Sequence, residues 1–418
     1  MLEADPDADR AAVAAVCGRL ALMITRAPGL MPQTRATPEE TRRYLEFGLA
    51  AVGEEETVAL VELLLAEGGW AFGFSDPPPS PEVRERMRIA AARAVSAAER
   101  LGRADLLSIA LDVQHISHEL HDDVRAMAAG VERRRGLADQ VVAFIDLDDI
   151  FYMSAQVAWE QGRYRDALRF SEEGIARVAA LGGESRGSSS TLALSQFLLG
   201  DWDAVVEESR RVIEDFGTEP PGFLRLVISV AEFVLAARHE TGALEPLRKI
   251  ELSASMRLSF RALGLRAEGR AEEGLALIRA DVRPNEGRSF EMMAKAQLLE
   301  TLGGFAELAT LCTEIRERAQ RAGWAAGPAM ADRLDAARLL TEGDAAGAAE
   351  LARSSADRFA ETGAEWEAAV SRLTLAEALH ALGRAGDAAA ALAEAEPALR
   401  RAGAVAELER FAALSARG

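Results

Sequence analysis

Two stretches near the middle of the chain share one pattern: WEQGRYRDAL at residues 159–168 and FLLGDWDAV at residues 197–205. In both, a glycine lies three positions after a large aromatic residue, a second aromatic residue follows two positions later, and an alanine comes soon after. A glycine tolerates the positive φ that ends a helix, and the residues after it can begin an antiparallel neighbour. The pattern therefore predicts helix–turn–helix units.

The pattern recurs toward the C-terminus, as LRAEGRAEEGL at 265–275, LGGFAEL at 302–308, LTEGDAAGA at 340–348 and LGRAGDA at 382–388. Its glycines are spaced by 38 residues from Gly162 to Gly200, 35 from Gly269 to Gly304 and 39 from Gly304 to Gly343. The longer interval after Gly200 leaves room for a degenerate copy near 238–242. Periods of this size are typical of tetratricopeptide-like repeats. Such units bury their apolar faces by stacking on their neighbours.

We therefore predict an all-α fold, a right-handed α-solenoid of tetratricopeptide-like repeats. Residues 1–135 are predicted to be a helical segment with divergent repeats, and 136–418 the repeat array, with a joint near 217–262. Two helix starts stand out in the N-terminal part. Thr37 precedes Pro38 and is followed three residues on by Glu40, and Ser80 precedes Pro81. Both are typical N-cap sequences.

The charge and the cysteine content indicate which partners are disfavoured and in which compartment the protein is expected. The net charge is −19, from 67 acidic and 48 basic residues, so a phosphate backbone or an anionic membrane surface is disfavoured as a partner. Cys17 and Cys312 are the only cysteines, and we expect both to be buried, reduced thiols. The first residues carry no signal peptide and no apolar run is long enough to span a membrane, so we expect a cytoplasmic protein.

Two further stretches resemble the C-terminal region of large ATP-binding bacterial regulators, those linked to nucleotide-cyclase or LuxR-type helix-turn-helix domains. They are AAERLGRADLLSIALD at 97–112 and LTLAEALHALGRAGDA at 373–388, the second followed by RAGA at 401–404. The resemblance implies a regulator of signalling or transcription. The chain contains no GxxxxGK[ST] motif, so the ATPase module of those regulators is missing. What remains resembles their sensor or scaffold arm, either as a stand-alone relative or as part of a longer protein.

Candidate binding residues lie on the predicted helix 150–161, which offers Tyr152, Gln156 and Trp159 to the inner groove. Trp159 equally suits the core of its repeat. His118 belongs to the cluster His115, His118 and His121. At about 100° per residue, His121 points away from His115, so we predict no metal site and no cofactor.

An enzymatic alternative rests on Asp146, Asp148 and Asp149, whose spacing is similar to the acidic motifs of all-α terpene cyclases. Acidic residues at the start of a helix are also favoured by its dipole, and we prefer that interpretation. Gly182–Ser190 is expected to be a loop between helices. The sequence leaves three hypotheses: a non-enzymatic scaffold that binds a protein or peptide partner, an effector-sensing arm that binds a small molecule, and an all-α enzyme.

Overall fold

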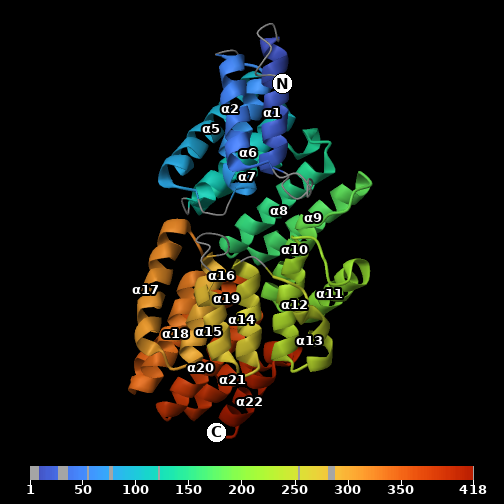
Figure 1. The fold of residues 1–418 in the computed structure, drawn as a ribbon. Coiled ribbons are helices and arrows are strands. Elements are labelled where there is room, and N and C mark those ends of the chain that lie inside the picture. The colour runs from blue at the N-terminus through green and yellow to red at the C-terminus, as the bar shows by residue number, and fades with distance from the viewer. Residues whose placement is uncertain are drawn as a thin grey trace. The chain divides into compact units, whose positions relative to one another are not determined.

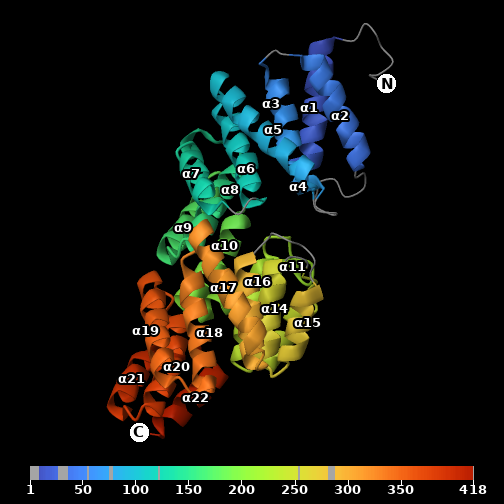
Figure 2. The same ribbon diagram turned by 90° about the vertical axis from the view of Figure 1, so that its left-hand side faces the viewer.

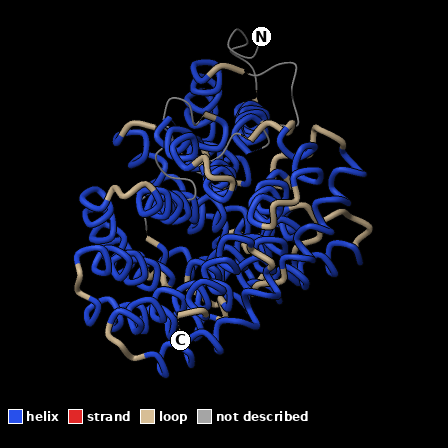
Figure 3. Tube along the Cα trace, turned by 90° about the horizontal axis from the view of Figure 1, so that it is seen from below, coloured by secondary structure: helices blue, strands red, loops and turns tan. Residues whose placement is uncertain are grey.

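A computed structural model describes residues 9–26, 36–53, 56–74, 79–120, 123–252, 255–280 and 288–417. Throughout these ranges the chain forms α-helices joined by short turns and one 3-10 helix, and no strand (Figure 3). None of the described helices is both long enough and apolar enough to cross a membrane. The predicted all-α fold is confirmed.

The chain divides into two compact units, Met1–Ile150 and Phe151–Gly418, and each is described by itself. The division falls inside helix α8 (Phe144–Glu160), beyond the predicted boundary at 135/136. The predicted joint within 217–262 stays a prediction.

Helices of the N-terminal unit pack mainly on their neighbours in sequence around a core that includes Leu45, Leu63 and Met87. The predicted caps are confirmed: Thr37 and Glu40 form a capping box, and the Ser80 side chain accepts from the N–H of Val83. The helices are α1 (Arg10–Arg26), α2 (Pro38–Val52), α3 (Val58–Gly68), α4 (Trp70–Gly73), α5 (Pro81–Arg100), α6 (Ala104–Leu120) and α7 (Val124–Arg135).

The C-terminal unit contains the repeat array (Figure 1). Its helices after α8 are α9 (Tyr164–Ala180), α10 (Gly187–Leu199), α11 (Trp202–Phe216), α12 (Arg225–Ala237), α13 (Thr241–Arg248), α14 (Ser255–Ala267), α15 (Ala271–Ala280), α16 (Arg288–Thr301), α17 (Phe305–Ala322), α18 (Ala326–Glu342), α19 (Ala345–Thr362), α20 (Glu365–Ala381), α21 (Ala385–Ala402) and α22 (Val405–Ser415). Helix α10 begins at Gly187, so the expectation of a loop over Gly182–Ser190 was wrong for its second half.

The repeat turns follow the sequence pattern with two exceptions. Gly162, Gly200, Gly269, Gly343 and Gly383 all have positive φ, as predicted. In the turn before α17 the positive φ belongs to Gly303 and not to Gly304. In the degenerate copy the position is taken by His239, at φ 57°, which is the one non-glycine residue with positive φ in the described ranges.

Helices α10, α12, α14, α16, α18 and α20 form an inner row, in which each helix packs on the next. Helix α20 also packs on α10, so the inner row of this solenoid returns to its start and forms a ring. Figure 2 shows the unit from the side, with α14 to α16 and α18 to α22 on different sides of it. The sequence pattern predicted the stacking but not this closure.

Backbone contacts hold the two ends of the ring together. The N–H of Ala325, just before α18, donates to the carbonyl of Glu160 at the end of α8, over 3.1 Å. Gly162 lies so close to α18 and α19 that a Cβ added to it would stand 2.7 Å from the Cβ of Ala325 and 2.9 Å from Cγ2 of Thr362. We call this junction, between α8–α12 and α18–α21, the seam.

Candidate functional site

The centre of the ring is filled by large apolar side chains, at least one from each inner helix. They are Phe197 on α10, Phe233 on α12, Phe260 on α14, Phe290 on α16, Met330 on α18 and Trp366 on α20. These side chains lie at different positions along their helices, and the closure of the ring brings them together although they are far apart in sequence. Five of the six are buried in the core, and Phe290 is partly buried against it.

The aromatic rings pack against one another across the centre. Phe260 meets Phe197 edge-on at 5.4 Å between centroids and Phe290 at 5.6 Å. Trp366 lies 6.0 Å from Phe233 and 5.1 Å from Trp202, the first residue of α11. These separations are those at which aromatic pairs attract one another beyond simple burial of area. The centre of the ring is thus a continuous aromatic cluster.

A hollow of about 30 Å³ remains at this centre, and we call it the aromatic hollow. Such a volume has room for a water molecule. Besides the aromatic rings, Leu198, Leu263, Met293 and Met330 line its apolar wall, and Ser259, Gln297 and Glu367 provide polar groups. Met293 is half-buried, and a methionine side chain adapts its shape readily because it is unbranched. A molecule larger than water needs more room than this hollow provides, so its entry would require Met293 to rotate away.

Trp366, one of the residues that line the hollow, carries an unused hydrogen-bond donor. The Nε1 of Trp366 is buried and has no hydrogen-bond partner, and the same holds for Nε1 of Trp159. Leaving a buried donor unsatisfied costs about 1–3 kcal/mol. Such donors are rare in folded proteins, and each is a place where a ligand or a water could bind.

The charged groups near the hollow are paired. Glu367 forms an ion pair with the buried Arg333, whose Nη2 also lies 3.1 Å from the sulfur of Met330. Tyr164 is buried beside them, and burial, reinforced by the charges of Glu367 and Glu160, raises the pKa of its hydroxyl. At neutral pH this phenol is uncharged.

The residues predicted for binding are only partly brought together. Tyr152, Gln156 and Trp159 all lie on α8, and the ring of Trp159 packs edge-on at 6.0 Å against Phe290, which lines the hollow. Tyr152 instead packs against Phe223 at 5.2 Å, and Gln156 is half-buried. His118 lies on α6 in the N-terminal unit. Their roles in binding stay predictions.

The acidic motif Asp146, Asp148 and Asp149 lies away from the hollow, in a largely buried charged cluster of the N-terminal unit. Asp146 pairs with Arg26 at 2.5 Å, and Asp149 pairs with Arg134, which also contacts Asp112 at 3.1 Å. The interpretation of these aspartates as acidic residues at the start of a helix is incomplete, because their partners lie more than ten residues away and the Arg134 side chain is fully buried. None of these aspartates lines the aromatic hollow.

His115 lies beside this cluster and is buried, with neither ring nitrogen hydrogen-bonded. Burial, with the nearby charge of Arg134, lowers its pKa to about 3. His121 and Asp122 lie outside the described residues. Within the described ranges, no three His, Cys, Asp or Glu side chains gather so that they could hold a metal ion.

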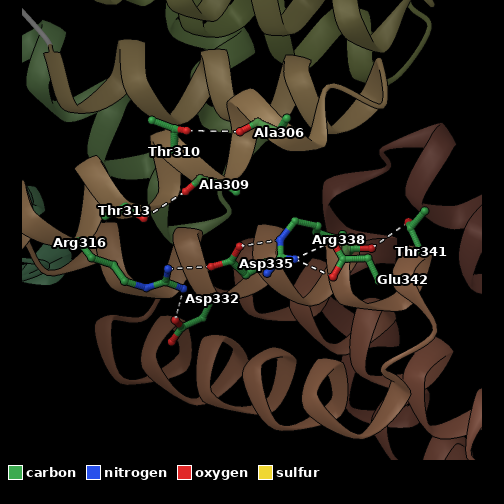
Figure 4. Close-up of polar contacts among 11 residues, drawn as sticks. Ala306, Ala309, Thr310, Thr313, Arg316, Asp332, Asp335, Arg338, Thr341 and Glu342 are labelled. Atoms are coloured by element: carbon green, nitrogen blue, oxygen red, sulfur yellow. Dashed lines mark hydrogen bonds and ion pairs between the residues drawn. The ribbon is translucent and has the colours of Figure 1, made fainter.

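A second polar network joins α17 to α18 (Figure 4). Arg316 bridges Asp332 at 2.9 Å and Asp335 at 2.7 Å, and Arg338 links Asp335 to Glu342. Figure 4 shows these side chains directed at one another between the two helices. The buried thiol of Cys312 lies on α17, and burial, followed by the charge of Asp335, raises its pKa to about 12. At neutral pH this thiol is protonated, and the ion pairs near it link α17 to α18.

No family model matches the chain, and no curated protein matches it. Among solved structures it is similar to a protein described as "Circular tandem repeat protein with novel repeat topology and enhanced subunit contact surfaces", with 14% sequence identity over 98% of both chains and a TM-score of 0.19.

Proposed function

We propose that this chain is a non-catalytic, effector-binding protein whose C-terminal ring takes up a small apolar molecule in the aromatic hollow. The observation that supports this most is the wall of the hollow, to which every inner helix contributes a large apolar side chain. Ligand pockets are typically lined in this way, by apolar and aromatic side chains with a few polar groups. Because those side chains come from all six helices, a molecule bound there contacts every repeat of the ring.

A peptide in an open inner groove receives less support. The inner faces of α10 to α20 are turned toward one another, and Phe197, Phe233, Phe260 and Trp366 are all buried. A helix with its side chains is about 10–12 Å across and would have to separate the inner helices, whereas a one-ring molecule needs a much smaller opening of the hollow. We propose instead that any protein partner binds the outer surface, where the excess negative charge favours a basic partner.

The cellular process in which the protein acts is also a proposal. The resemblance of residues 97–112 and 373–388 to bacterial regulators supports a role in signalling or transcriptional regulation in the cytoplasm. A protein-binding scaffold without a ligand is the second candidate, supported by the repeat fold itself. The enzymatic alternative loses support, because Asp146 and Asp149 are ion-paired with arginines in the N-terminal unit and Glu367, which does line the hollow, is paired with Arg333.

The test uses α-methylstyrene, an uncharged one-ring hydrocarbon, as the probe. Binding to the folded protein should raise its melting temperature in proportion to the logarithm of probe concentration. Met293→Trp fills the rim of the hollow and should abolish the effect. Leu302→Trp introduces the same indole at an exposed turn away from the hollow and should leave the effect unchanged. No saturable binding, or equal binding to Met293→Trp, would show that the hollow is not a binding site.

A further inference from the structure

The side chains around the hollow indicate which chemical class of ligand it would bind. This inference rests on the proposed function. The decisive group is the indole of Trp366, which lines the hollow and whose Nε1 finds no acceptor in the part of the chain that the structure describes. Trp366 is nine-tenths buried or more, at 6% exposure, so bulk water does not satisfy this donor. A hydrogen-bond acceptor brought by a ligand would complete the site, taking the place that a single water molecule could otherwise occupy.

The charges around the hollow exclude an ionic ligand. Among the described residues of its wall the one carboxylate is that of Glu367, which is already neutralised by Arg333, and both side chains are largely buried. A second buried charge would have no counter-charge there, and a buried charge without a partner is strongly disfavoured. The ligand is therefore neutral at physiological pH.

The apolar wall of the hollow indicates the shape of the apolar part of the ligand. Phe260 and Phe290 lie at 5.6 Å between centroids with their planes tilted by 41°, and Phe233 presents its ring to Trp366 at 70°. The rings around the hollow thus lie at different angles to one another, which favours a flat ring that can stack on one of them and meet another edge-on. Met293 and Met330 adapt around its outline.

We propose that the aromatic hollow binds a neutral aromatic molecule bearing a carbonyl oxygen, and that this oxygen accepts a hydrogen bond from Nε1 of Trp366. The apolar ring supplies most of the contact, and the indole N–H selects for the acceptor. A site with an unused donor discriminates against a ligand that lacks the matching oxygen, because the donor then stays unpaired.

The experiment compares acetophenone with α-methylstyrene, which has nearly the same shape but carries a CH₂ group in place of the carbonyl oxygen. Dissociation constants are measured by titration calorimetry for the full chain and for two variants. Trp366→Phe keeps an aromatic ring and removes the N–H. Trp159→Phe removes another buried, unpaired indole N–H, from a residue that packs behind the wall.

We expect Trp366→Phe to weaken acetophenone binding about tenfold relative to α-methylstyrene, since tenfold corresponds to one typical hydrogen bond. Trp159→Phe should leave the ratio of the two affinities unchanged. If Trp366→Phe leaves that ratio unchanged while both compounds still bind, the hydrogen-bond inference is wrong and the proposed function stands. If neither compound binds the unaltered chain, the proposed function itself fails, and this inference with it.

A second measurement does not depend on the folding of a variant. In the unaltered chain labelled with ¹⁵N, the indole N–H signal of Trp366 should move downfield on titration with acetophenone, and much less with α-methylstyrene. Equal shifts with both compounds would contradict the proposed hydrogen bond.

Discussion

The Nε of Arg238, at the end of α12, donates a hydrogen bond of 2.7 Å to the carbonyl of Ala402, the last residue of α21 and 164 positions further along the chain. The same guanidinium contacts the exposed Asp203 at 2.8 Å. Ala402 is at a helix C-terminus, where a positive charge is favoured. Arg238 thus connects the two ends of the ring across the seam.

Replacing Arg238 by Ala should lower the free energy of unfolding by about 1–2 kcal/mol, because a hydrogen bond from a charged group to a largely buried carbonyl is lost. Arg211→Ala is the matched control, since Arg211 is exposed and its ion pairs within the described residues are with Glu207 and Glu208 of its own helix. That change should stay within about 0.5 kcal/mol. Chemical denaturation measures both, and equal effects would mean that the contact with Ala402 contributes nothing.

Gly162 lies at the seam and Gly200 at an ordinary repeat turn, and the two have similar backbone conformations. Gly162 has φ 71° and Gly200 has φ 85°, but only at Gly162 would a Cβ meet other atoms, in Ala325 and Thr362. Gly200→Ala should cost about 1–2 kcal/mol, from the left-handed conformation alone. Gly162→Ala should cost clearly more, because the seam must also open. Equal losses in denaturant titrations would argue against close packing at the seam.

His239 occupies the left-handed position that glycine takes in the other repeat turns, at φ 57°. His239→Gly should therefore stabilise the C-terminal unit by up to about 1 kcal/mol, since relief of the backbone strain outweighs the added freedom of the unfolded chain. His239→Val should destabilise it, because a β-branched residue is strongly disfavoured there. Thermal melts of the three proteins would refute this account if the glycine variant were the least stable.

His115 should make the N-terminal unit sensitive to acid. Its folded pKa is about 3, whereas a histidine in an unfolded chain titrates near pH ~6.5. Between these two pKa values the unfolded state binds more protons at this histidine than the folded state does. The free energy of unfolding is therefore highest above pH ~6.5 and decreases progressively as the pH falls toward 3. His115→Phe should flatten this dependence by up to about 1.4 kcal/mol per pH unit. Urea titrations from pH 7 to 4.5 measure it, and parallel curves for both proteins would contradict the burial of a neutral imidazole.

The repeats were predictable from the sequence because their signal is local. A glycine at each turn and an alanine-rich start of the next helix lie within ten residues of one another, as in 159–168 and 197–205. His239 shows where this local signal fails, since its turn has the same backbone conformation without a glycine. The start of α10 at Gly187 was missed for a similar reason, because its serines are typical of loops.

The aromatic hollow was not predictable in the same way. Phe197, Phe260 and Trp366 look like ordinary core residues of separate repeats, and only the closure of the inner row brings them together. Closure depends on small rotations accumulated over all the repeats, and no short motif records it. Trp159 was singled out from the sequence and does lie against the aromatic cluster, next to Phe290. Arg134 was missed, because its aspartate partners come from two other helices.

The closed ring is most directly tested by the energetic coupling between Trp202 and Trp366, whose centroids lie 5.1 Å apart across the seam. Trp202→Leu, Trp366→Leu and the double variant complete a thermodynamic cycle measured by denaturant unfolding. A closed ring predicts a coupling free energy of about 0.5–1.5 kcal/mol, because the two rings touch in the folded state. Strictly additive effects, with a coupling within about 0.3 kcal/mol of zero, would mean that the array is open and that α10 and α20 do not meet.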